Sequence, residues 1–247
     1  ADVYGLDWGG TAFGESERLL GSVLAQNPTL RDKMVLASKG SILPGVPYVA
    51  NAAYLNAACD ASLQRLQSSH IDLYQIHRPD MFTHPEETAA ALDGLVAAGK
   101  ISMVGVSNYT PAQIHALRGY LQAPLVSLQS QFSVSTLDIL RNGTLDLCME
   151  TGMTPLAWSP LAGGQIVSGD QQPAALSAAL DALAARENVD RAAIALGFIL
   201  AHPSACVPLI GSQSIARLEA ATAALNVCLT RRDIYQLIEA SEGVALP

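Results

Sequence analysis

Short apolar runs bounded by polar or turn residues recur along the chain, each about as long as a β-strand. Their continuous apolar character is typical of parallel strands buried on both faces. We therefore predict six strands. They are Met34–Ser38, Ile71–Ile76, Met103–Val106, Leu125–Leu128, Thr154–Ala157 and Cys206–Ile210.

The segments between these runs carry apolar residues at every third or fourth position, which predicts amphipathic helices. Helix-ending and helix-starting residues agree with this pattern: Thr110-Pro111 and Thr230–Asp233 resemble N-terminal caps, and Gly99 would end a helix. The predicted apolar faces are Leu55, Cys59, Leu63 and Leu66; Ile114, Leu117 and Leu121; and Ile215, Leu218, Thr222 and Leu225.

Strand and helix thus alternate about six times, which predicts a parallel sheet with helical crossovers. Six such units would form an open doubly wound sheet or most of an eight-unit barrel. The absence of a G-x-G-x-x-G turn weakens the first alternative. No linker divides the chain, so we predict one domain over residues 1–247, with long loops at Gly40–Pro47 and Leu161–Pro173.

Composition narrows the class of protein. Half of the 247 residues are apolar and 15% are charged, enough for a substantial core. The net charge of −8 argues against a nucleic-acid partner, and no apolar stretch approaches the roughly 20 residues of a membrane span. The four cysteines are widely separated and are expected to be buried thiols, so we predict a cytoplasmic protein.

Polar residues follow each predicted strand. In a parallel barrel, these positions open onto one face, where active sites are built. Each residue alone also has an ordinary structural explanation, but together they predict a site. They are Lys39; His77; Ser107 and Asn108; Gln129; Trp158 and Ser159; and Gly211 and Ser212.

Tyr4, Lys39 and His77 would together form a proton-donor set for a carbonyl oxygen. A phenol titrates near pH 10 and donates poorly at neutral pH unless a nearby cation stabilises the phenolate. Lys39 would supply that charge, and His77 would orient the carbonyl.

These residues lie in motifs that resemble the aldo-keto reductases, closest to a bacterial branch of oxidoreductases. The motifs run in the family's order across essentially the whole chain. They are Ala1–Gly5, Gly14–Glu17, Leu36–Lys39, Ile71–Pro79, Gly105–Tyr109, Trp158–Gly164 and Pro208–Ser212.

The resemblance implies a (β/α)8 TIM barrel, with about six of its eight units present in this chain. The barrel would bind NADP (NADPH), with NAD as the alternative cofactor. The resemblance makes Tyr4 the general acid, with Lys39 and His77 as catalytic partners. It assigns the nicotinamide carboxamide to Ser107, Asn108 and Gln129, and the nicotinamide ring to Trp158. It places Ser159, Pro160 and Leu161 along the pyrophosphate, and Gly211, Ser212, Gln213 and Arg217 near the 2′-phosphate.

The sequence departs from the family in three places. The family's catalytic aspartate would fall two residues before Ala1 and its first two strands earlier still, so we expect the natural polypeptide to be longer. Gly211 stands where the family often has lysine, and Ala220-Ala221 replaces its adenine-facing Glu-Asn pair.

We therefore expect an NADP-dependent reductase of a small aldehyde or ketone. One alternative is a sugar or pyridoxal dehydrogenase that runs in the oxidative direction, and another is a cofactor-binding, redox-sensing subunit with little turnover. Trp8, Met81, Phe82 and Tyr109 are candidates for the wall of an apolar substrate pocket. No motif indicates an oligomeric state.

Overall fold

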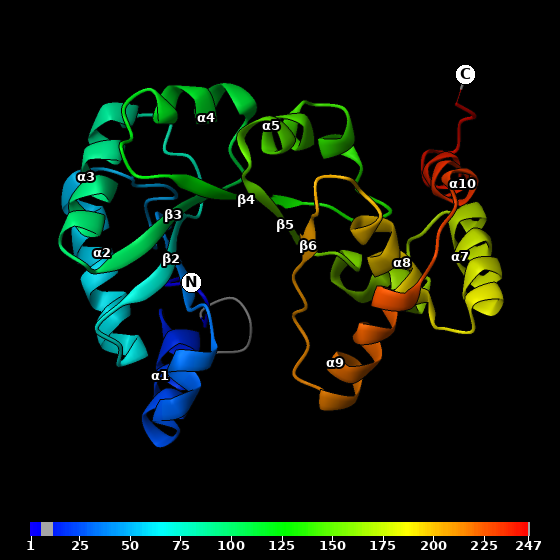
Figure 1. Ribbon diagram of the computed structural model, residues 1–247, viewed down its shortest axis with the longest axis horizontal. Helices are drawn as coiled ribbons and strands as arrows, with labels where there is room; N and C mark the ends of the chain where they lie inside the picture. Colours follow the sequence, from blue (N-terminus) through cyan, green and yellow to red (C-terminus); the bar gives the residue numbers. More distant parts are fainter. Residues whose placement is uncertain (6–11, 247) are drawn as a thin grey trace. The chain divides into compact units, whose positions relative to one another are not determined.

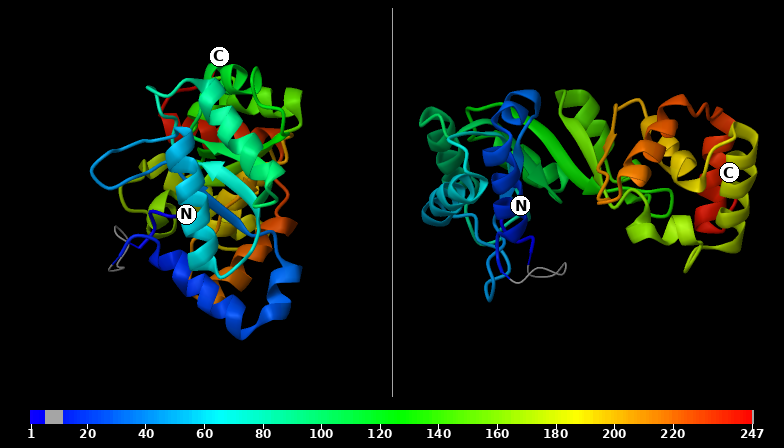
Figure 2. Two further views of the ribbon diagram at one scale, coloured as in Figure 1. Left: turned by 90° about the vertical axis from the view of Figure 1, so that its left-hand side faces the viewer. Right: turned by 90° about the horizontal axis from the view of Figure 1, so that it is seen from below.

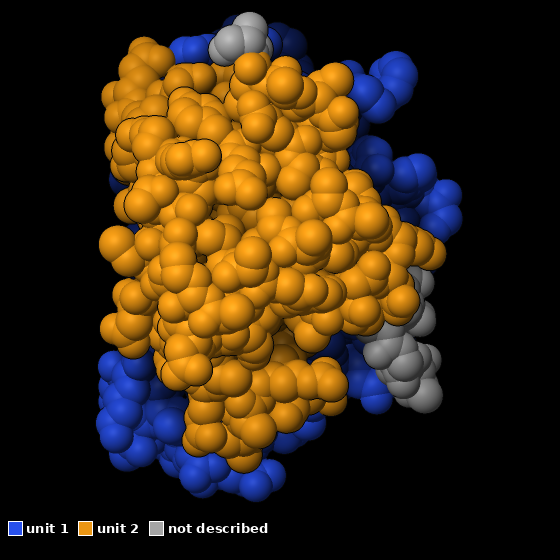
Figure 3. Space-filling model, turned by 90° about the vertical axis from the view of Figure 1, so that its right-hand side faces the viewer, with its two compact units in different colours: residues 1–128 blue, residues 129–247 orange. Residues whose placement is uncertain are grey.

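A computed structural model describes residues 1–5 and 12–246 of the chain (Figure 1). Strands and helices alternate six times in it, as the hydrophobic pattern predicts. The chain divides into two compact units, residues 1–128 and 129–247 (Figure 3), and the expectation of a single domain stays a prediction.

Unit 1 contains three parallel strands in sequential order and the helices between them (Figures 1 and 2). Successive helices pack against each other, α1 on α2, α2 on α3 and α3 on α4. The elements are α1 (Glu15–Gln26), a 3-10 helix (Pro28–Lys33), β1 (Ala37–Gly40), α2 (Ala52–Leu66), β2 (Ile71–Ile76), α3 (Pro85–Ala97), β3 (Ile101–Ser107) and α4 (Pro111–Arg118). Strand β4 (Leu125–Gln131) carries the chain into unit 2.

Unit 2 packs its helices around a core that includes Phe132, Phe198 and Leu237, and its strands β5 and β6 pair in parallel. Helix α10 lies against α7 (Figure 1). The helices and strands are α5 (Thr144–Thr151), β5 (Thr154–Trp158), α6 (Gln165–Ser168), α7 (Ala174–Glu187), α8 (Arg191–Leu200), β6 (Val207–Pro208), α9 (Ile215–Ala221) and α10 (Arg231–Glu242), with 3-10 helices at Asp138–Leu140, Ala162–Gly164 and Thr222–Asn226.

The predicted strand at Ile71–Ile76 is confirmed to the residue, whereas β1 begins three residues later than Met34. The reason lies at Leu36, whose amide donates to the carboxylate of Asp72 at 2.7 Å instead of to a neighbouring strand. Strand β6 is shorter than predicted and ends at Pro208, although the Leu209 amide still donates to the Ala157 carbonyl of β5 at 2.9 Å.

Both predicted N-terminal caps are confirmed. The Thr110 hydroxyl accepts a hydrogen bond from the Gln113 amide, and the Thr230 hydroxyl accepts one from the Asp233 amide. Gly99 follows the end of α3 with a φ of 69°, a left-handed conformation that costs glycine little.

The apolar face predicted at Ile215, Leu218 and Leu225 is not buried. Helix α9 forms, but it contains no buried residue. Ile215 and Leu218 on α9 are 74% and 41% exposed, and Leu225, on the following 3-10 helix, is 74% exposed. Apolar residues at helical spacing predict a helix with one apolar face, but burial of that face requires a neighbouring element to pack on it.

The cysteines are all free thiols, and Cys59, Cys148 and Cys206 are buried as predicted. Cys228 is exposed, because it lies in the loop before α10 and not on an inward face. No helix in the described part of the chain combines the length and apolar character that a bilayer crossing requires.

Candidate active site

Three segments of unit 1 bring Tyr4, Lys39 and His77 together. Tyr4 lies in a turn before α1, Lys39 lies on β1, and His77 directly follows β2. Strand register pairs Gly40 with Ile76, and the His77 amide donates to the Gly40 carbonyl at 2.7 Å. The parallel pairing of β1 and β2 therefore places Lys39 and His77 at the same strand ends.

The side chains of these residues lie within interaction distance of each other. The Tyr4 and His77 rings meet edge to face, with centroids 5.6 Å apart and an interplanar angle of 84°. The Lys39 ammonium nitrogen lies 5.8 Å from the centre of the Tyr4 ring. A phenol, an imidazole and an ammonium group thus converge, which is the combination that the sequence predicts.

Burial controls the titration of this cluster. Burial lowers the pKa of Lys39 to about 8, although the Asp2 carboxylate opposes the shift. Burial, with the charge of Lys39 as the next largest cause, lowers the pKa of His77 to about 3. At neutral pH, the imidazole is therefore neutral and most of the Lys39 side chains carry a charge.

The pKa of Tyr4 moves opposite to the expected direction. Burial raises the pKa of the phenol, and the charge of Arg78 only partly offsets this effect. The hydroxyl consequently keeps its proton at neutral pH. Arg78 was not among the predicted residues, although its place directly after His77 is a sequence signal that could have drawn attention to it.

Asp2 is a second residue of the cluster that sequence reasoning missed. It is fully buried, accepts a hydrogen bond from the Tyr54 hydroxyl at 3.1 Å, and donates its backbone N–H to the Lys39 carbonyl at 3.0 Å. Burial, with the Glu17 carboxylate as the next cause, raises the pKa of Asp2 to about 7. This backbone hydrogen bond to Lys39 holds the turn that contains Tyr4 against strand β1.

Ser107 and Asn108 lie at the end of β3, in the same unit as Tyr4. Ser107 is 1% exposed. Asn108 adopts a left-handed φ of 59°, and its amide donates to the Ser107 hydroxyl at 2.8 Å and to the His77 carbonyl at 3.3 Å. A hydroxyl and an amide next to the His77 backbone offer the neutral donors and acceptors that a carboxamide needs, so the chemistry of these residues fits a nicotinamide.

The next group of predicted cofactor residues belongs to unit 2. Gln129 is buried on β4, and Trp158 ends β5 in a partly buried position. Ser159 has a left-handed φ of 50°. Pro160 is buried, and Leu161 packs against the core of the unit.

The predicted phosphate residues lie on a largely exposed segment that comprises the loop after β6 and the first turn of α9, which carries Arg217. Gly211, Gln213 and Arg217 are exposed, and Ser212 is partly buried, its hydroxyl accepting from the Ser214 amide at 3.1 Å. An exposed guanidinium can bind a phosphate group through two parallel hydrogen bonds. Arg217 therefore suits the phosphorylated cofactor by its chemistry.

The candidate pocket walls differ in burial. Tyr109 is 9% exposed and packs inside unit 1, whereas Met81 is 73% and Phe82 is 97% exposed. Trp8 lies outside the described residues. Met81 and Phe82, in the loop after β2, remain the accessible apolar side chains of the set.

Comparison with known proteins identifies the family and the fold of the chain. The sequence profile described as "Aldo/keto reductase family" matches residues 1–242. The chain belongs to the aldo-keto reductase family. Its fold is similar to that of a crystallised thermostable aldo-keto reductase in complex with the inhibitor epalrestat, with a TM-score of 0.80 and 24% identity, covering 92% of this chain and 78% of that one.

Two curated relatives of this aldo-keto reductase share a name. The chain is 46% identical over 248 residues to the 6-dehydroglucose reductase of Novosphingobium aromaticivorans, spanning 100% of this chain and 81% of the relative. It is 36% identical over 252 residues to the 6-dehydroglucose reductase of Agrobacterium fabrum, spanning 98% of this chain and 82% of the relative. The family and these relatives support carbonyl reduction as the general chemistry of the chain.

Proposed function

We propose that this aldo-keto reductase reduces the aldehyde group of an oxidised sugar to an alcohol, with NADPH as the hydride donor. The observation that carries the proposal is the convergence of Tyr4, His77 and Lys39 in unit 1. The substrate class is supported by the names of two relatives, 46% and 36% identical, that cover nearly all of the chain.

Tyr4 is the general acid in this proposal. Burial raises the pKa of its phenol, so the hydroxyl is protonated at neutral pH, and donation to the carbonyl oxygen relies on the nearby Lys39 ammonium to stabilise the phenolate that forms. A reduced nicotinamide, when bound, supplies a hydride. As the carbonyl carbon gains that hydride, the oxygen takes the proton from the Tyr4 hydroxyl, and the C=O group becomes CH–OH.

Lys39 and His77 assist this proton transfer in different ways. Tyr4 becomes a phenolate when it gives up its proton, and the Lys39 ammonium, 5.8 Å from the ring centre, stabilises that negative charge. His77 is neutral at pH 7, and its Nδ1 is buried without a hydrogen-bond partner among the described residues. In this proposal the neutral imidazole, which meets the Tyr4 ring edge to face, orients the carbonyl oxygen.

The cofactor residues follow the family pattern in this proposal. Ser107, Asn108 and Gln129 hold the carboxamide, and Trp158 stacks on the nicotinamide ring. The exposed guanidinium of Arg217 favours the phosphorylated cofactor over NAD. The remaining contacts come from Ser159, Pro160, Leu161, Gly211, Ser212 and Gln213.

The proposal is tested by measuring cofactor binding and turnover separately. NADPH and NADH are titrated by fluorescence, and rates are then measured with 6-dehydroglucose and with a simple aliphatic aldehyde, in both reaction directions. We expect tighter binding of NADPH and faster reduction of the sugar aldehyde. Faster oxidation of the alcohol would favour a dehydrogenase, and tight binding without turnover would favour a sensing role.

Substitution of the general acid gives the sharpest result. We expect Tyr4→Phe to lower kcat about 1,000-fold while NADPH affinity stays within about twofold, because the hydroxyl is needed only for proton transfer. Tyr120→Phe, at a tyrosine that is 43% exposed, is the matched control and should keep full activity. Equal activity in both variants would contradict the role of Tyr4.

A further inference from the structure

The carboxyl group of Asp2 is buried with few hydrogen-bond donors around it. Asp2 lies two residues before Tyr4 in the same turn. Its oxygen Oδ2 lies 3.1 Å from the Tyr54 hydroxyl oxygen, whereas Oδ1 is buried without a hydrogen-bond partner among the described residues. An ionised carboxylate has about four acceptor sites, and each site left empty in the interior adds to the cost of burying the charge. These surroundings favour the neutral acid.

The Tyr54 hydroxyl has two acceptors within reach but only one proton. Its oxygen lies 3.1 Å from Asp2 Oδ2 and 3.1 Å from the Ile42 carbonyl oxygen. A carbonyl only accepts, and an ionised carboxylate also only accepts, so one of the two contacts would then lack a proton. When Asp2 carries a proton, it donates to the Tyr54 oxygen, and Tyr54 donates to Ile42. Only the neutral acid therefore satisfies both contacts.

A second phenol near Asp2, that of Tyr74 on β2, does not change this balance. Tyr74 and Asp2 both approach Gly40 of β1: a Cβ atom on that glycine would lie 2.2 Å from the Tyr74 hydroxyl and 3.5 Å from Asp2 Oδ2. The Tyr74 hydroxyl nevertheless has no hydrogen-bond partner among the described residues, so it does not donate to Asp2. Of these two phenols, only Tyr54 contacts the carboxyl group.

Charged groups from several elements face Asp2. Glu17 on α1 adds a second carboxylate, which disfavours a charge on Asp2, while Arg65 on α2 favours it. The Arg65 guanidinium, however, already donates to Glu17 Oε2 at 2.7 Å and to the Ser62 hydroxyl at 3.1 Å. Burial and Glu17 together raise the pKa of Asp2 to about 7, which agrees with the hydrogen-bond geometry. The remaining titratable groups that face Asp2 are the Ala1 amino group, Tyr54 on α2, Lys39 on β1 and Tyr74 on β2.

We propose that Asp2 is held as a neutral acid, which donates to Tyr54, which in turn donates to the Ile42 carbonyl. This chain of two hydrogen bonds joins the turn that contains Tyr4, helix α2 and the loop after β1. The backbone N–H of Asp2 also donates to the Lys39 carbonyl at 3.0 Å. The chain and this bond together hold Tyr4 beside Lys39, so Asp2 and Tyr54 are positioning residues for the general acid.

The protonation of Asp2 also acts on the charge of Lys39. This effect on turnover rests on the proposed function, whereas the protonation state itself does not. A neutral Asp2 adds no negative charge to oppose the phenolate that forms on Tyr4. Above about pH 7, the ionised form of Asp2 raises the pKa of Lys39, so the ammonium keeps its charge to a higher pH than it would without Asp2.

Infrared spectroscopy tests the protonation state without any turnover. At about pH 5.5, aspartates with an ordinary pKa are ionised, so the difference spectrum between wild type and Asp2→Asn should show the C=O band of one protonated carboxyl group. The band should disappear by about pH 8.5, with a midpoint near 7. Asp32→Asn, at an exposed aspartate, is the matched control and should show no such band. Its absence for Asp2 at about pH 5.5 would overturn the proposal.

Thermal unfolding at two pH values gives a second readout. The folded pKa of Asp2, about 7, lies above the ordinary value of 3.8, so the carboxyl group destabilises the fold increasingly as pH rises between these values. Asp2→Asn is neutral at every pH and keeps an N–H that donates to Tyr54. It should unfold at the wild-type temperature near pH 4 and at a higher temperature near pH 8. A lower unfolding temperature near pH 8 would mean that the carboxylate is the structural form and would overturn the proposal.

Reductase kinetics test the positioning role. Tyr54→Phe breaks both hydrogen bonds of the chain and should lower kcat about tenfold, with NADPH affinity unchanged, because Tyr4 is held less accurately. Tyr48→Phe, at a tyrosine that is 39% exposed, is the matched control and should keep full activity. Equal kcat values for Tyr54→Phe and wild type would overturn the positioning role.

The pH profile separates this role from a purely structural one. Asp2→Asn should move the alkaline limb of kcat/KM to lower pH, because the carboxylate no longer supports the charge on Lys39. A structural residue would instead lower activity equally at every pH, and that result would overturn the link to Lys39. If wild type has no reductase activity, the proposed function fails, while the infrared and unfolding measurements still decide the state of Asp2.

Discussion

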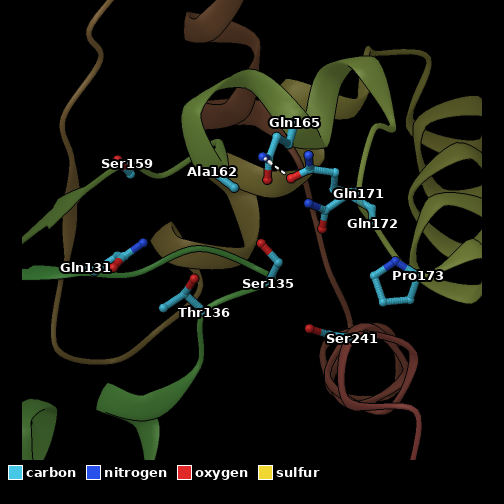
Figure 4. A pocket seen from close by; sticks show the side chains of 10 residues that line it. All are labelled: Gln131, Ser135, Thr136, Ser159, Ala162, Gln165, Gln171, Gln172, Pro173 and Ser241. Carbon is cyan, nitrogen blue, oxygen red and sulfur yellow. Dashed lines mark hydrogen bonds between the residues drawn. The ribbon is translucent and has the colours of Figure 1, made fainter.

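The two units of this aldo-keto reductase collect different kinds of polar groups. In unit 1, Tyr4, Lys39 and His77 are ionisable, and burial shifts the pKa of each one. In unit 2, a cavity of about 400 Å³ beside Ser159 is lined mainly by neutral amides and hydroxyls (Figure 4). Proton transfer requires groups that change charge, whereas binding through hydrogen bonds requires only donors and acceptors. The difference teaches that burial in unit 1 acts on charge, because it shifts the pKa of the groups that can move a proton.

The two capping boxes show a similar contrast. Thr110 and Gln113 cap α4 in unit 1, and Thr230 and Asp233 cap α10 in unit 2. Only the second cap, among these two, also receives a guanidinium: Arg186 donates to both oxygens of Asp233, at 2.8 and 2.9 Å. The same local motif therefore makes an additional long-range connection in unit 2.

The largest effect on stability is expected at Lys39. Because its folded pKa of about 8 lies below the unfolded value of 10.5, the buried charge destabilises the fold below pH 8, and this cost disappears as pH rises to 10.5. Lys39→Met should therefore raise the free energy of unfolding by about 2–3 kcal/mol at pH 7 and by almost nothing at pH 10.5. Denaturant unfolding at several pH values measures this difference.

The control for Lys39→Met is Lys33→Met, at an exposed lysine outside the cluster. It should change stability by less than about 0.5 kcal/mol at any of these pH values. A pH-independent effect of Lys39→Met would show that the substitution acts through packing and not through the buried charge. Reductase activity of Lys39→Met should fall in either case.

The capping boxes give the next largest effect. Asp233→Ala should lower the free energy of unfolding by about 2 kcal/mol, because it removes both the cap and the two Arg186 contacts. Gln113→Ala should lower it by about 0.5–1 kcal/mol, and denaturant unfolding measures both. The hydrogen bonds from Arg186 hold the pKa of Asp233 below its usual range. This stabilisation is therefore present above about pH 4 and is lost as pH falls further. Equal costs in the two variants would remove the contrast between the caps.

The effect expected at Arg217 concerns cofactor binding and is smaller than those of Lys39→Met and Asp233→Ala on stability. If it binds the 2′-phosphate, Arg217→Ala should weaken NADPH binding about tenfold, equivalent to about 1.4 kcal/mol, and leave NADH binding unchanged. Arg118→Ala, at an exposed arginine of α4, is the control. Fluorescence titration with both cofactors measures the effect, and an equal loss for NADPH and NADH would argue against a phosphate contact.

Much of the candidate site could be predicted because strand ends are visible in the sequence. Lys39 and His77 each follow a recognisable apolar run, and parallel pairing brings such positions together. Asp2 was missed because no local pattern distinguishes it from a surface charge, whereas the place of Arg78 directly after His77 was a signal that went unused. Their influence on Lys39 and Tyr4 depends on distances that only the folded chain defines.

The sequence by itself determined the alternation of strands and helices, both capping boxes and the residues at the strand ends, because these features depend on near neighbours in the chain. The tertiary structure alone decided which apolar helix faces are buried against a neighbouring element, as the exposed residues of α9 show. It also decided the upward shift in the pKa of Tyr4 and assembled the cavity from residues between Gln131 and Ser241. Burial and cavities arise from contacts between distant segments, which periodicity along the chain does not record.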